Sequence, residues 1–103
     1  MSEDSVSALV KYRLLEATET LTEAEILRDA GSYRGAVNRA YYAMFYALLG
    51  LLATRQLVSS KHSGAIALFD REFVKTGIFP PELSRSLHLA FQRRQRHDYA
   101  DIE

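Results

Sequence analysis

Residues 33–55 constrain the fold more than any other part of the chain. Their apolar side chains recur at three- and four-residue steps and form two adjoining helical stripes. The stripes comprise Val37, Tyr41, Met44, Leu48, Leu51, Phe45, Leu49 and Leu52. A row of alanines (Ala36, Ala40, Ala43 and Ala47) lets a neighbouring helix approach closely. A helix that is apolar on several faces belongs at the centre of a domain or in a dimer interface.

The remainder of the chain predicts helices that surround this one. Proline is absent before Pro80, and helical periodicity dominates. We expect helices over about residues 4–30, 33–55, 62–75 and 81–99. Their inward side chains are expected to be Val6, Val10, Leu14, Ala17, Leu21 and Ala24 in the first helix, Ile66, Phe69 and Phe73 in the third, and Leu83, Leu87, Ala90 and Phe91 in the fourth. Residues 1–103 are therefore expected to form one all-α domain, an up-down antiparallel bundle of about four helices.

Composition excludes several classes of protein. The chain has no cysteine, which rules out disulfides and thiolate metal sites and agrees with a cytoplasmic location. Its apolar runs are shorter than the roughly 18 residues that a membrane span needs, and its acidic N-terminus does not resemble a secretory signal. The three histidines (His62, His88 and His97) are scattered, so we predict no metal site and no cofactor. His88 has no obvious partner and is expected at the surface.

Charge is distributed unevenly along the chain. The formal net charge is zero, but residues 1–30 carry a net charge of −4 and residues 31–100 a net charge of +6. The basic part ends in an arginine-rich helix. A local basic surface can bind nucleic acid even where the global charge is balanced.

Asn38 and Arg39 are unusual because they lie in the most apolar helix. Burying an unpaired arginine is costly. Arg39 either faces outward or pairs with an acid on the first helix, or both residues line a cleft that reaches the fourth helix.

Two further polar clusters lie later in the chain. Ser60-Lys61-His62-Ser63-Gly64 is typical of a helix start, where His62 caps or packs; alternatively, Lys61 and His62 help to hold a phosphate. Residues 93–99 place guanidinium, imidazole and phenol groups on one helical turn, from Arg93, Arg94, Arg96, His97 and Tyr99. Such a set suits phosphodiester cleavage, and its alternative is a solvated basic helix end.

Several of these segments together resemble the HEPN family (higher eukaryotes and prokaryotes nucleotide-binding), and in particular its small stand-alone prokaryotic members. The resemblance rests on Gly31-Ser32-Tyr33, on residues 36–45 with the sequence Ala-Val-Asn-Arg-Ala-Tyr-Tyr-Ala-Met-Phe, on residues 61–64, and on Arg94-x-x-x-Asp98-Tyr99. It covers nearly the whole chain. It implies a helical bundle that is commonly a homodimer.

The resemblance also implies a function. Many members are metal-independent endoribonucleases, often toxins paired with a small nucleotidyltransferase antitoxin, and their signature is an arginine, four to six residues, then a histidine, often followed by x-Tyr. His97-Asp98-Tyr99 matches the end of that signature, and we assign catalytic roles to Arg93, Arg94, His97 and Tyr99. Binding roles fall to Asn38, Arg39, Lys61, His62, Arg96 and Asp98.

One departure from the signature leaves two functions open. Gln92 stands where the shortest family spacing requires arginine, and Arg93 and Arg94 lie closer to His97. The chain is thus either a ribonuclease toxin that acts on single-stranded RNA, or a non-catalytic module that binds a nucleotide or a partner protein. The resemblance also implies a further helix after the position of Tyr99, which family members usually have. We expect a naturally short protein or one that lacks this helix, with apolar surface exposed beside the cleft.

Overall fold

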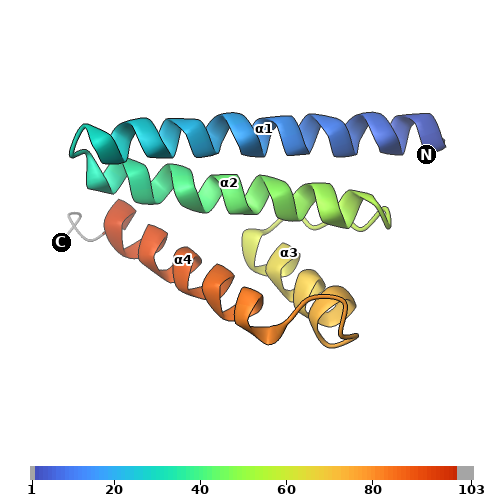
Figure 1. Cartoon of the computed structure of the whole chain (residues 1–103). Helices are drawn as coiled ribbons and strands as arrows, with labels where there is room; N and C mark the ends of the chain where they lie inside the picture. The colour runs from blue at the N-terminus through green and yellow to red at the C-terminus, as the bar shows by residue number, and fades with distance from the viewer. Residues whose placement is uncertain (1, 100–103) are drawn as a thin grey trace.

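The computed structural model describes the backbone of residues 2–99 and the side chains of residues 2–96. Within this range the chain is helical, and the described residues include no strand. The elements are α1 (Glu3–Asp29), α2 (Tyr33–Ala53), α3 (His62–Phe69), the π-helical segment η1 (Asp70–Val74) and α4 (Pro81–Tyr99). The expected all-α class is therefore confirmed. Figure 1 shows α1 and α2 as a long antiparallel pair, with α3 and α4 on the opposite side of α2.

Local chemistry explains where the helices begin and end. Ser2 caps α1, because its hydroxyl accepts a hydrogen bond of 3.1 Å from the amide of Ser5. Gly31 has a φ of 79° after this helix, a left-handed conformation that favours glycine. Helix α2 ends two residues before the predicted Arg55, in a turn where Gln56 has a φ of 55°.

The predicted third helix, residues 62–75, is not a uniform α-helix. It changes at Asp70 into five π-helical residues. The Asp70 carboxylate accepts a hydrogen bond of 2.6 Å from the hydroxyl of Ser84 and lies 2.8 Å from Nε2 of His88. Both partners belong to α4, so Asp70 fastens the π-helical segment to the last helix.

Helix α2 occupies the centre of the molecule, as its composition predicts. The buried core combines its residues with those of α3, η1 and α4, and comprises Tyr41, Phe45, Leu48, Leu52, Ala65, Ile66, Phe69, Phe73 and Leu87. Three aromatic rings (Phe69, Phe73 and Phe79) pack together where η1 meets the start of α4; Phe69 and Phe73 are stacked, and Phe79 is tilted against both. The inward positions predicted for the third helix are thus confirmed.

The apolar stripe predicted for α1 is only partly buried. Ala17, Thr20 and Ala24 are its buried residues, whereas Leu14 and Leu21 are each 50% exposed. The prediction fails because, within the described part of the chain, α1 packs along α2 and makes no comparable contact with another helix (Figure 1). The bundle is therefore open on one side.

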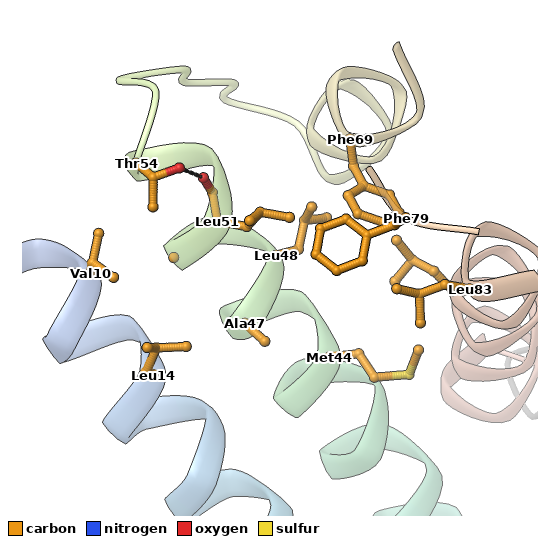
Figure 2. Close-up of a pocket in the computed structure, with 12 residues that line it drawn as sticks. Val10, Leu14, Met44, Ala47, Leu48, Leu51, Thr54, Phe69, Phe79 and Leu83 are labelled. Atoms are coloured by element: carbon orange, nitrogen blue, oxygen red, sulfur yellow. Dashed lines mark hydrogen bonds between the residues drawn. The ribbon is translucent and has the colours of Figure 1, made fainter. Parts of the chain in front are cut away.

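An apolar groove of about 380 Å³ marks this open side. It runs between the first half of α1, the second half of α2 and the start of α4 (Figure 2). Its lining includes Val10, Leu14, Met44, Leu48, Leu51, Phe79, Leu83 and Leu87. Leu83 was predicted to point inward but is 40% exposed, so this position of α4 differs from its prediction.

Candidate functional site

Arg94 brings the arginine-rich end of α4 into contact with α2. Its Nη2 donates a hydrogen bond of 3.0 Å to the hydroxyl of Tyr42. Its guanidinium carbon lies 5.3 Å from the centroid of the Tyr42 ring and 5.7 Å from that of Tyr41, within the range of cation–π attraction. Arg93 and Arg96 are exposed. Of the three arginines, Arg94 is therefore the one that faces α2.

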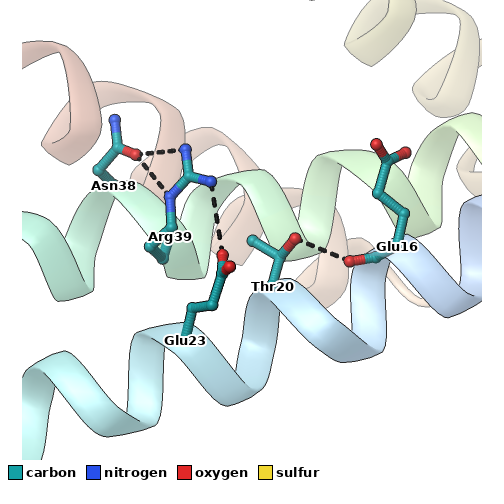
Figure 3. A network of polar contacts seen from close by, with 5 residues as sticks. All are labelled: Glu16, Thr20, Glu23, Asn38 and Arg39. Atoms are coloured by element: carbon teal, nitrogen blue, oxygen red, sulfur yellow. Dashed lines mark hydrogen bonds and ion pairs between the residues drawn. The ribbon is translucent and has the colours of Figure 1, made fainter.

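Arg39 approaches the same tyrosine from within α2. Its guanidinium carbon lies 5.1 Å from the centroid of the Tyr42 ring. Nε and Nη2 of Arg39 both donate to Oδ1 of Asn38, at 3.0 and 2.8 Å, and Nη1 lies 3.7 Å from a carboxylate oxygen of Glu23 on α1 (Figure 3). The expected pairing with an acid of the first helix is thus confirmed, and Tyr42 links this pair to α4.

His62 packs into an aromatic cluster beside these arginines. Its ring stacks on Phe45 with 4.0 Å between centroids, and its Nδ1 lies 2.9 Å from the hydroxyl of Tyr41. The packing role predicted for His62 is thus confirmed. Lys61 is exposed, and its amide bonds to the hydroxyl of Ser59 at 3.3 Å. Their phosphate-binding role stays a prediction.

Burial changes the acidity of the Tyr41–His62 pair in opposite directions. Burial raises the pKa of Tyr41 to about 12, although the Arg94 guanidinium opposes this rise. Burial, assisted by the charge of Arg94, lowers the pKa of His62 below its ordinary 6.5. Near neutral pH the imidazole is therefore uncharged, so Nδ1 can accept the hydrogen bond that the Tyr41 hydroxyl donates.

The side chains of the predicted catalytic and binding residues beyond Arg96 lie outside the described part of the chain. These are His97, Asp98 and Tyr99, whose backbone continues α4. Residues four apart on a helix share a face, so His97 stands one turn after Arg93 and Asp98 one turn after Arg94. Gln92 and Arg93 are both exposed on the last turns of the described helix.

Some residues and contacts of the site were not predicted from the sequence. Glu23 belongs to a periodic helical segment and has no sequence feature that distinguishes it from its neighbours. Tyr42 lies in the segment that carries the family resemblance, but no role was assigned to it. His88, expected to lack a partner, is at the surface but pairs with Asp70, 18 residues earlier. Among the described side chains, no three of His, Asp or Glu come together as a metal site.

Comparison with known proteins identifies the family to which the chain belongs. A sequence model of the HEPN domain matches residues 10–103. The chain belongs to the HEPN family. A relative from Thermotoga maritima, named "UPF0332 protein", is 40% identical over 94 residues, which cover 91% of this chain and 71% of the relative.

Two HEPN relatives from Methanocaldococcus jannaschii carry a functional name. "Putative toxin MJ0142" is 41% identical over 93 residues (88% of this chain, 63% of the relative), and "Putative toxin MJ0605" is 35% identical over 96 residues (93% and 69%). This HEPN chain thus spans 63–71% of the length of the three relatives. No solved structure gives a significant match. Within the described residues, no helix is both long enough and apolar enough to cross a membrane.

Proposed function

We propose that this HEPN protein is a toxin that cleaves single-stranded RNA in the cytoplasm without a metal ion. The observation that carries the proposal is the contact between Arg94 and Tyr42. It joins two segments that are 52 residues apart and that were each singled out for their chemistry, Asn38-Arg39 on α2 and the arginine-rich end of α4. Two guanidinium groups therefore lie around one tyrosine ring, and cations so placed can hold a phosphodiester.

In the proposed reaction, a histidine transfers protons and an arginine stabilises negative charge. The ribose 2′-hydroxyl attacks the neighbouring phosphorus and gives up its proton, while the bond to the 5′-oxygen breaks and that oxygen takes up a proton. His97 exchanges protons in this scheme because imidazole titrates near neutral pH. Arg93 or Arg94 stabilises the charge that develops on the phosphoryl oxygens, and Tyr99 stacks on a base or donates a hydrogen bond.

A homodimer is the proposed working form. The accessible surface of the chain is 6741 Å², whereas a globular monomer of 11.7 kDa exposes about 5,900 Å². The chain therefore exposes more surface than a compact monomer of its mass does. The apolar groove and the exposed Leu14 and Leu83 at its rim support a second copy of the chain on this face. A small nucleotidyltransferase is the proposed antitoxin.

Cleavage in the presence of a chelator tests the enzymatic proposal. Purified protein is incubated with single-stranded RNA and EDTA, beside His97→Ala, Arg94→Gln and a surface control, Arg85→Gln. We expect cleavage by the wild type and by the control, and loss of about 100-fold or more in rate for His97→Ala. Equal cleavage by the wild type and His97→Ala, or none by either, contradicts the proposal.

A non-catalytic binding module is the second candidate function. The observation that favours it is Gln92, which stands at the position where the shortest spacing of the family signature requires arginine. In this case Arg94, Arg39 and their neighbours hold a nucleotide or an acidic partner surface. Binding of AMP or of the nucleotidyltransferase without any RNA cleavage is the result that selects this function.

A further inference from the structure

The Arg39 side chain is held in place on one edge and weakly paired on the other. Asn38 Oδ1 accepts two hydrogen bonds, from Nε and Nη2 of Arg39, and this fixes the plane of the guanidinium group. On the other side, Nη1 lies 3.7 Å from the Glu23 carboxylate. A charge-assisted hydrogen bond is about 2.7–2.9 Å long. Glu23 therefore forms an ion pair with Arg39 but lies beyond hydrogen-bond distance (Figure 3).

The pair between Arg39 and Glu23 is also open to solvent. The side chains are 33% and 56% exposed, respectively. An exposed ion pair of this length contributes little to stability, because water and salt screen it. An anion with better geometry could therefore displace the carboxylate at small cost.

A second cation contacts the same tyrosine ring as Arg39. The guanidinium carbons of Arg39 and Arg94 lie 5.1 and 5.3 Å from the centroid of the same Tyr42 ring. Tyr42 fixes Arg94 by accepting its hydrogen bond, while Asn38 fixes Arg39. Both guanidinium groups are thus ordered before any ligand arrives, which lowers the entropy that binding must overcome.

We propose that Arg39 and Arg94, aligned by Asn38 and Tyr42, form a binding site for phosphate groups, in which the Glu23 carboxylate occupies the place of the anion in the unliganded protein. The inference rests on the proposed function because it names the ligand of the same site. It adds a regulatory element, since Glu23 weakens binding and must be displaced. The phosphate belongs to a polynucleotide backbone or to a free nucleotide.

Binding of ligands that cannot be cleaved tests the site. A single-stranded 2′-O-methyl oligonucleotide keeps its phosphates but lacks the 2′-hydroxyl nucleophile, and AMP and inorganic phosphate serve as the smaller probes. Affinity is measured at several salt concentrations for the wild type, Arg39→Gln and Glu23→Gln. The matched controls are Arg85→Gln and Glu82→Gln, an ion pair of 3.2 Å on α4 whose side chains are 69% and 71% exposed.

The two test variants are expected to change affinity in opposite directions. Arg39→Gln should weaken oligonucleotide binding about 10-fold and lower the slope of log K against log salt by about one. Glu23→Gln should strengthen binding by about two- to five-fold, because the internal competitor is gone. Both controls should bind as the wild type does, and thermal unfolding verifies that every variant is folded.

The probes distinguish the source of the phosphate and the outcomes that overturn the site. Oligonucleotide binding alone supports a polynucleotide backbone, and AMP or phosphate binding that depends on Arg39 supports a free phosphate group. Wild-type affinity in Arg39→Gln, weaker binding in Glu23→Gln, or no binding of any probe overturns the inference. If the probes bind but RNA is not cleaved, the nuclease proposal is wrong and this site is retained. If RNA is cleaved and the cleavage does not depend on Arg39, the nuclease proposal is retained and this site is overturned.

Discussion

At the scale of single residues, the hydrogen bond between Tyr41 and His62 makes stability depend on pH. The folded protein holds His62 at a lowered pKa, so the unfolded chain binds a proton more readily between that pKa and 6.5. Stability from neutral His62 is fully present above pH 6.5 and is lost as the pH falls toward the folded-state pKa. Protonation also removes the acceptor that Nδ1 offers to Tyr41.

This linkage predicts the behaviour of His62→Gln. Urea unfolding between pH 5 and 7.5 should show a smaller loss of stability toward acid in the variant than in the wild type, because glutamine does not titrate. At the alkaline end, Tyr41 predicts a second decline between pH 10 and about 12, since its hydroxyl ionises more easily in the unfolded chain. Parallel acid slopes in the two proteins would show that His62 is not the group responsible.

Removing one oxygen atom from Tyr42 measures how much the contact between α2 and α4 contributes to stability. Tyr42→Phe keeps the ring that both arginines approach but removes the acceptor of the Arg94 hydrogen bond. We expect a loss of about 1 kcal/mol in the free energy of unfolding. Tyr12→Phe is the control, because Tyr12 is 57% exposed and should change stability by less than ~0.5 kcal/mol. A similar effect of the two substitutions would contradict the assigned bond.

At the scale of elements, the close approach of α1 and α2 depends on Gly50. A Cβ atom at this buried position would lie 3.2 Å from Cβ of Arg13 and 3.7 Å from the backbone oxygen of Val10. Gly50→Val should therefore destabilise the protein by about 1–3 kcal/mol, because the α1 backbone must move. Ala67→Val, at an exposed position of α3, measures the cost of valine in a helix alone. Equal losses would mean that the two helices are not in tight contact.

The elements were more predictable from sequence than the contacts between them. Helical periodicity located all the helices, and α1 differs from its predicted range, 4–30, by one residue at each end. Periodicity cannot reveal which face of a helix lacks a partner, so Leu14 and Leu21 were wrongly expected inside. The bond from Arg94 to Tyr42 spans 52 residues and depends on how α4 crosses α2. The sequence pattern of a single helix does not predict how that helix crosses another.

At the scale of the whole molecule, openness is the main feature. The radius of gyration is 14.5 Å, compared with about 12.8 Å for a compact domain of this length. We expect the chain to self-associate through the groove face, with a dimer mass in light scattering after size exclusion. Replacing Leu14 and Leu83 by serine should shift the protein toward the monomer. Val58→Ser, at an 87% exposed position outside the groove, should not. A monomeric wild type contradicts the proposed dimer.

The central claim is that the α2 segment around Tyr42 and the α4 segment around Arg94 act as one site. The most direct test is a double-mutant cycle on the single-turnover rate of RNA cleavage, with Tyr42→Phe, Arg94→Gln and the combined variant. If the 3.0 Å bond joins them functionally, the combined loss in rate should be clearly smaller than the product of the two single losses. Losses that multiply independently would contradict the account.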